Sequence, residues 1–212
     1  MEAAENLKIL ALLPAYNEEA HLGKVLSQVK EQTADVLVVD DGSKDKTAEI
    51  ARAAGVELLS RGYNCGKGQS LKDGYVWALE HGYDAVIMLD SDGQHDPTCI
   101  KDFIKKYQET HAHLIIGARN YNEIPLHRRI PNIIGKVMFS IAVGRDIPDN
   151  QSGYRMLDRT LMERMLEVDI NIEENIDIEA EVAVKIAEEA EAGVADIKNI
   201  IIGEAVEVVV IV

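Results

Sequence analysis

Hydrophobic positions in the first half of the chain alternate between two periods. Short apolar runs predict buried strands at residues 7–13, 35–40, 56–60, 84–90 and 113–119. Apolar residues at helical spacing predict helices at 18–32, 45–54 and 68–82, and a further helix begins at Pro97 with Asp96 as its N-terminal cap. Strands that alternate with helices through short connections require right-handed crossovers. The expected fold class is α/β, a doubly wound, mostly parallel sheet with helices on both faces.

The second half shows weaker patterns. Residues 125–144 have a helical apolar face, 149–157 form a polar loop that enters a strand, and 177–193 predict a long acidic amphipathic helix. One or two further strands are expected after Val194. A length of 212 residues suits one domain with a full core, so we expect a single domain over 1–212.

Composition and charge narrow the class of partner. A net charge of -15 argues against nucleic acid or an anionic membrane as a general partner, because such surfaces attract a basic face. The two cysteines, Cys65 and Cys99, lack metal-type spacing, which favours a reduced, cytoplasmic compartment. The apolar segment 197–212 is interrupted by Glu204 and Glu207 and is too short for a spanning helix. We expect no transmembrane segment and no signal peptide.

Polar motifs follow the predicted strands, at residues 14–19, 40–47, 61–68, 90–97 and 119–123. Doubly wound sheets bind ligands outside the carboxyl ends of their strands. The sequence therefore predicts that these five motifs gather around one ligand site.

The motif "DSDGQHDP" carries the strongest chemical signal. In an extended strand Asp90 and Asp92 face the same way, and two such carboxylates need a metal, a basic side chain or a proton to neutralise them. Their oxygens and the Gln94 amide suit a hard divalent cation such as Mg²⁺ or Mn²⁺. A plain helix cap would explain Asp96 but not Asp90. His95 is interpreted as a packing or surface residue.

Three further motifs have a structural and a functional interpretation. Asp40 and Asp41 precede a turn at Gly42. Their side chains are either simply solvated beside that turn or bind the base or ribose of a ligand. Lys67 lies in a glycine-rich turn that can approach an anion. Arg119 is a solvated charge or, at the end of the fifth strand, holds a phosphate against a metal.

Taken together, six segments resemble the family 2 glycosyltransferases, in particular the dolichyl-phosphate mannose and polyprenyl-phosphate glucose synthases. They are "LPAYNEE", "VVDDGSKDKTAEIA", "NCGKGQSLKDGYVWA", "MLDSDGQHDP", "GARNY" and "NQSGYR", within about residues 7–157. The resemblance implies a GT-A fold and inverting transfer of a hexose from a nucleotide-diphosphate sugar, of the GDP-mannose or UDP-glucose type, with Mg²⁺ or Mn²⁺. It also implies a polyprenyl or dolichyl phosphate acceptor and peripheral membrane contact. The sequence leaves open whether the protein forms a homodimer.

The resemblance assigns the nucleotide sugar to residues 1–120 and the acceptor to 121–212. It implies nucleotide-sugar contacts for Pro14, Tyr16, Glu18, Asp40, Asp41, Asp90, Ser91 and Arg128, to which the glycine-rich turn adds Lys67. The implied metal ligands are Asp90, Asp92 and Gln94, and the residues expected to act in transfer are Asp92, Arg119 and Asp149. Asp149 is the nominated base for a hydroxyl acceptor, whereas an acceptor phosphate is already anionic and needs none. Asn132 is a further candidate near the phosphates.

Three rival functions share parts of this pattern. They are a receiver-like Mg²⁺-binding signalling module, a non-catalytic nucleotide-sugar binder, and a GT-A-like nucleotidyltransferase. The receiver pattern places its acidic pair after the first strand and a lysine after the fifth, whereas here a strand and a helix precede Asp40 and Asp41, and Arg119 follows the fifth strand. A nucleotidyltransferase has a glycine-rich, arginine-bearing loop after the first strand, and "PAYNEE" has neither feature. The family's aromatic residue before Glu-x-Glu is also missing, because Ile178 precedes Glu179.

Overall fold

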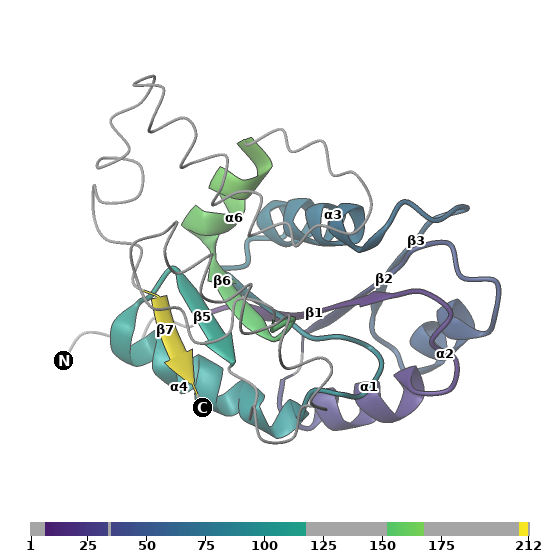
Figure 1. Cartoon of the computed structure of the whole chain (residues 1–212), viewed down its shortest axis with the longest axis horizontal. Coiled ribbons are helices and arrows are strands. Elements are labelled where there is room, and N and C mark those ends of the chain that lie inside the picture. The colour runs from purple at the N-terminus through teal and green to yellow at the C-terminus, as the bar shows by residue number, and fades with distance from the viewer. Residues whose placement is uncertain (1–6, 34, 118–151, 168–207, 212) are drawn as a thin grey trace, which may run out of the picture.

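The computed structural model describes residues 7–33, 35–117, 152–167 and 208–211. The strands are β1 (Ile9–Ala15), β2 (Val36–Asp40), β3 (Glu57–Ser60), β4 (Ala85–Met88), β5 (Leu114–Gly117), β6 (Arg155–Asp158) and β7 (Val208–Ile211). The helices are α1 (Leu22–Lys30), α2 (Thr47–Ala53), α3 (Lys67–Glu80), the 3₁₀ turn η1 (Pro97–Cys99), α4 (Ile100–Thr110) and α6 (Arg159–Glu167). They form one sheet with helices on both faces (Figure 1).

The sheet is mostly parallel, as the sequence predicts. Its strand order is β3-β2-β1-β4-β6-β5-β7, and β1 pairs in parallel with β2 on one side and β4 on the other. β6 was expected only as a strand of unknown direction, and it runs antiparallel between β4 and β5. Hydrophobic periodicity identifies a strand but does not give its direction, which explains why this feature was not predicted.

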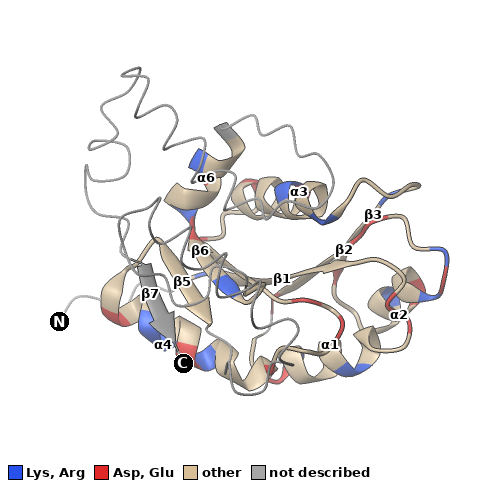
Figure 2. Cartoon of the chain, viewed as in Figure 1, with Lys and Arg blue, Asp and Glu red and all other residues tan. Residues whose placement is uncertain are grey.

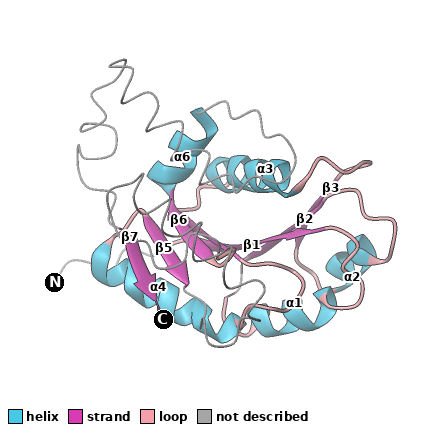
Figure 3. Cartoon of the chain, viewed as in Figure 1, coloured by secondary structure: helices cyan, strands magenta, loops and turns pink. Residues whose placement is uncertain are grey.

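The core forms two layers because successive side chains of a strand point to opposite faces. Leu10 and Leu12 of β1 pack with buried residues of α3 and α6, whereas Ala11 and Leu13 pack with those of α1 and α4. Figure 3 shows the same division, with α3 and α6 on one face of the sheet and α1, α2 and α4 on the other. Strands buried on both faces explain the nearly continuous apolar runs in the sequence.

The start of the α4 region matches the sequence prediction, whereas α6 was missed. Asp96 accepts a hydrogen bond from the Thr98 backbone N at 2.9 Å, and Pro97 follows it as expected for a cap. In the same way Asp158 accepts from the Leu161 backbone N at 2.8 Å and starts α6. The signal for this helix was present, but no element was predicted for residues 159–167. Its apolar residues recur at helical spacing: Leu161, Met162, Met165 and Leu166.

Two predicted helices, at 125–144 and 177–193, lie outside the described residues. β7 confirms a strand in the predicted C-terminal region after Val194. No helix among the described residues has the length and apolar character needed to cross a membrane.

Helix α3 lies unusually close to strand β1. A β carbon at Gly74 would lie 2.5 Å from one Leu12 methyl carbon and 2.6 Å from the other. Leu12 is fully buried, so its side chain has no open space to move into. Gly74 therefore sets the distance between α3 and β1, which matters because the first residue of α3 is Lys67.

We expect Gly74→Ala to destabilise the protein by about 1–3 kcal/mol, because the added methyl overpacks the core. Helix propensity acts in the opposite direction and favours alanine by up to about 1 kcal/mol. The matched control is Gly23→Ala in α1, where the new β carbon makes ordinary contact with Ile50 at 3.5 Å. Urea unfolding measures both variants. Equal or higher stability of Gly74→Ala would show that α3 can shift freely.

Candidate functional site

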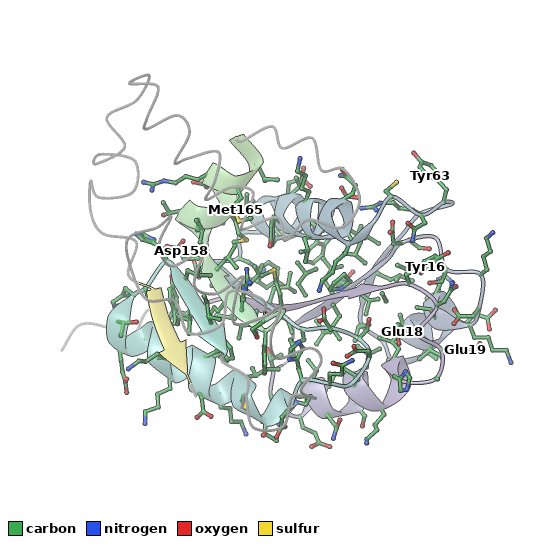
Figure 4. All side chains as sticks on the ribbon, viewed as in Figure 1. Tyr16, Glu18, Glu19, Tyr63, Asp158 and Met165 are labelled. Atoms are coloured by element: carbon green, nitrogen blue, oxygen red, sulfur yellow. The ribbon has the colours of Figure 1, made fainter. Side chains whose placement is uncertain are left out.

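The loop after β1 is joined to the loop after β2. Three backbone N–H groups of the first loop donate to side chains of the second: Asn17 to Ser43 Oγ at 2.8 Å, Glu18 to Thr47 Oγ1 at 2.8 Å and Glu19 to Asp45 Oδ2 at 3.0 Å. Tyr16 is 45% exposed, and Figure 4 shows it with Glu18 and Glu19 at the opposite end of the molecule from Asp158. These bonds fix the backbone of the first loop and leave the Tyr16 ring accessible.

Asp40 is turned into the protein at the end of β2. Its carboxylate accepts from the Ser43 backbone N at 3.1 Å and from the Ser60 hydroxyl at 2.8 Å, and the residue is 2% exposed. Asp40 therefore closes the turn after β2 and links it to β3.

Asp41 is buried as well, and it holds the start of α3. One carboxylate oxygen accepts from Arg61 Nη1 at 2.6 Å and from the Cys65 backbone N at 2.9 Å, and the other accepts from the Gly66 backbone N at 2.8 Å. Arg61 also donates to Asp73 of α3. Burial opposes the charge of Arg61, but its bonds to Asp73 and Asp41 raise its pKa.

The Arg61 network was not predicted from the sequence. A strand-end arginine in a strongly acidic chain is the signal that could have indicated it. Asp73 lies on the predicted helix 68–82, with no local pattern to connect it with Arg61, which is twelve residues earlier.

Asp90 lies just beyond β4, where the Lys67 ammonium compensates its charge and the His95 ring lies nearby. Lys67 Nζ donates to Asp90 Oδ1 at 2.5 Å, and His95 Nε2 lies 3.4 Å from Oδ2. Burial acts to raise the pKa of Asp90, but the His95 contact and the Lys67 charge hold it well below the usual range. Among the three ways of neutralising Asp90 that the sequence left open, the structure shows a basic side chain.

His95 packs inside the protein, as its interpretation as a packing residue suggests. Its side chain is 11% exposed, and its ring centroid lies 5.1 Å from that of Tyr154. The Tyr154 hydroxyl donates to the Asp96 carbonyl at 3.2 Å, and burial raises its pKa. The contact between His95 and Asp90 was not predicted, because the adjacent motif gave no reason to orient the ring.

The segment after Asp90 bends instead of continuing the strand. The Ser91 hydroxyl donates to the Pro14 carbonyl at 2.6 Å, and Asp92 accepts from the Gln94 backbone N at 2.9 Å. Gly93 has a positive φ of 78°, which a turn requires. The extended form therefore does not reach Asp92, and the geometric reason for placing Asp90 and Asp92 on one face was wrong.

The side chains at this bend supply oxygen atoms of the kind that a hard divalent cation takes. Asp90 and Asp92 are both partly exposed, and Gln94 is exposed beside them. In the described parts of the chain no three His, Cys, Asp or Glu side chains could hold a metal together. Mg²⁺ is commonly bound through one or two carboxylates plus substrate phosphates, so a site here needs phosphate oxygens to complete it.

The predicted "NQSGYR" motif partly reaches this site. A β carbon at Gly153 would lie 2.7 Å from Asp90 Oδ2. The other predicted residues of the acceptor side, Arg119, Arg128, Asn132 and Asp149, lie outside the described residues. Lys and Arg are interspersed with Asp and Glu on the described elements in the view of Figure 2.

Comparisons with known proteins identify the family of this chain. The model of the family described as glycosyl transferase family 2 matches residues 11–166. An undecaprenyl-phosphate mannosyltransferase from Micrococcus luteus is 32% identical over 161 residues, which cover 70% of this chain and 65% of that protein. An uncharacterized protein from Methanocaldococcus jannaschii is 39% identical over 142 residues, which cover 64% and 62% respectively.

Solved structures share the fold. Glucosyl-3-phosphoglycerate synthase from Mycobacterium tuberculosis, in complex with Mn²⁺, UDP-glucose and phosphoglyceric acid, has a TM-score of 0.64 at 18% identity, covering 90% of this chain and 82% of that one. The chain spans 62–65% of the length of three curated relatives that it matches. Because the family model matches residues 11–166, more than half of the chain, this chain belongs to glycosyl transferase family 2.

Proposed function

We propose that the chain transfers a hexose from a nucleoside diphosphate sugar to an acceptor, with inversion and with the help of Mg²⁺ or Mn²⁺. The observation that supports this proposal most directly is the position of Asp90 and Asp92 at the carboxyl end of β4. Asp90 there contacts Lys67, and Ser91, between the two aspartates, bonds to Pro14 of β1, in a chain of family 2. Carboxylates at this edge of a doubly wound sheet meet ligand phosphates through a cation.

In the proposed donor site, some of the residues that the sequence suggested as ligands hold the loops in place instead. Asp40 and Asp41 already accept bonds from the protein, so we assign them first to holding the loops in place. The exposed Tyr16 ring and the loop from Pro14 to Glu18 are proposed to contact the nucleotide base. Ser91 keeps the segment after β4 against β1.

Asp90, Asp92 and Gln94 are proposed to hold the cation against the donor diphosphate. When bound, the cation stabilises the negative charge that develops on the departing nucleoside diphosphate. Lys67 adds a positive charge on the same side, because its ammonium already reaches Asp90.

The proposed acceptor is a lipid-linked phosphate, which would bring the protein to a membrane surface. The name of the Micrococcus luteus relative, an undecaprenyl-phosphate mannosyltransferase, supports it. Arg119 and Arg128 are proposed to hold the acceptor or donor phosphates. A phosphate acceptor needs no general base, whereas a sugar hydroxyl would require one, for which Asp149 is proposed.

Thermal unfolding with a panel of nucleotide sugars tests this function. We expect one donor, together with Mn²⁺, to stabilise the protein by about 2.7 kcal/mol at a concentration 100 times its Kd. Asp92→Asn should lose most of this effect. The control, Asp102→Asn, removes the same charge from an exposed position on α4 and should keep it. Stabilisation by no donor, or equal stabilisation of Asp92→Asn, contradicts the proposal.

A second prediction concerns the close approach of Gly153 to Asp90. In Gly153→Ala the added methyl would displace the Asp90 carboxylate, and we expect roughly tenfold weaker binding of Mn²⁺ with UDP or GDP. The control is Gly62→Ala, whose new β carbon would have no heavy atom within 4 Å. Isothermal titration calorimetry measures both. Unchanged affinity in Gly153→Ala would exclude Asp90 as a rigidly placed ligand.

A further inference from the structure

Two cationic side chains lie beside the carboxylates of the site, and they are held very differently. The Arg61 side chain is 16% exposed and donates to Asp41 and Asp73. The Lys67 side chain is 53% exposed and donates to Asp90, which is itself 31% exposed. Arg61 is therefore fixed in the protein, whereas the Lys67 ammonium can leave its partner for solvent or for another anion.

The backbone of Lys67 is nevertheless fixed. The preceding residue, Gly66, donates its backbone N–H to Asp41, and Gly74 holds α3 close to β1. A fixed backbone and a long, partly exposed side chain limit the Lys67 ammonium to positions around Asp90. This combination suits a cation that changes partner within one site.

The Lys67 ammonium is bonded to the Asp90 carboxylate, which is also a proposed ligand of the divalent cation. Nζ lies 2.5 Å from Asp90 Oδ1, while His95 and Gly153 enclose Oδ2. A divalent cation on Oδ1 would be next to a positive charge on the same oxygen, and like charges that close repel. Metal binding therefore requires Lys67 to move.

We propose that Lys67 is the resident counter-charge of Asp90 in the free protein and that it moves to the diphosphate of the donor when metal and nucleotide bind. This inference rests on the proposed function. In this role Lys67 is a positioning residue: it lowers the affinity for metal alone and raises the affinity for metal together with nucleotide. Lys67 is thus the source of a coupling between the two ligands, and such a coupling is reciprocal.

The experiment measures Mn²⁺ binding by electron paramagnetic resonance, with Mn²⁺ alone and with saturating UDP or GDP. For Mn²⁺ alone we expect Lys67→Met to bind about tenfold more tightly than the unmodified protein, because the competing charge is gone. The control Lys105→Met removes an exposed lysine of α4 and leaves the pair intact, so it should change the affinity little. Far-UV circular dichroism verifies that each variant is folded.

The nucleotide arm tests the second half of the exchange. UDP or GDP should increase Mn²⁺ affinity strongly in the unmodified protein and in Lys105→Met, and much less in Lys67→Met. Lys67→Arg retains the charge and should restore most of the nucleotide effect. If Lys67→Met and Lys105→Met bind Mn²⁺ with equal affinity in the absence of nucleotide, the inference is overturned.

The outcomes separate the inference from the proposed function. If nucleotide increases Mn²⁺ affinity equally in Lys67→Met and in the unmodified protein, the exchange is wrong and the function stands. If neither nucleotide increases Mn²⁺ affinity in the unmodified protein, the donor function fails, and the exchange fails with it. Absence of Mn²⁺ binding by Lys67→Met under any condition also overturns the inference, since the vacated carboxylate should then accept the metal.

Discussion

The ion pair between Asp41 and Arg61 is the interaction on which the site depends. Asp41 follows β2, Arg61 follows β3, and Arg61 Nη1 lies 2.6 Å from Asp41 Oδ1. The Asp41 carboxylate also accepts hydrogen bonds from the backbone N–H groups of Cys65 and Gly66, which lead into α3. Removal of one partner from such a buried pair typically costs about 3–5 kcal/mol, because the other charge stays behind uncompensated. The pair therefore fixes where α3 begins, and with it the backbone of Lys67.

The sheet brings the remaining parts of the site to this anchor. β1 lies between β2 and β4, so the loops after these three parallel strands share one edge. The antiparallel direction of β6 adds a fourth segment: Arg155 pairs with Met88, so the residues before β6 lie beside the residues after β4. This explains how Gly153 and Tyr154, more than fifty residues away in sequence, contact Asp90 and His95. The surroundings of Asp90 and His95 on this side are then a consequence of topology.

Local patterns predicted the parts of this arrangement that are themselves local. The period of two in the strands, the period of 3.6 in the helices and the Asp96 cap gave the parallel half of the sheet, because each depends on neighbouring residues. The sequence did not predict the direction of β6, the inward orientation of Asp41 or the contact of Lys67 with Asp90. Those features join residues 20 or more positions apart, and no local periodicity encodes which distant partner a charge will find. The assumption that β4 stays extended to Asp92 failed for a similar reason, since the Ser91 hydroxyl bonds to a carbonyl of β1.

The central claim is that Asp90 and Asp92 hold a cation against a nucleoside diphosphate at the carboxyl end of β4. Anomalous diffraction from a crystal grown with Mn²⁺ and UDP or GDP tests it most directly, because the signal locates manganese without assumptions about the ligands. The account predicts a manganese peak coordinated by a carboxylate oxygen of Asp90 or Asp92 and by the diphosphate, with Lys67 Nζ withdrawn from Asp90. A nucleotide bound at another edge of the sheet, or manganese bound away from both aspartates, would contradict it.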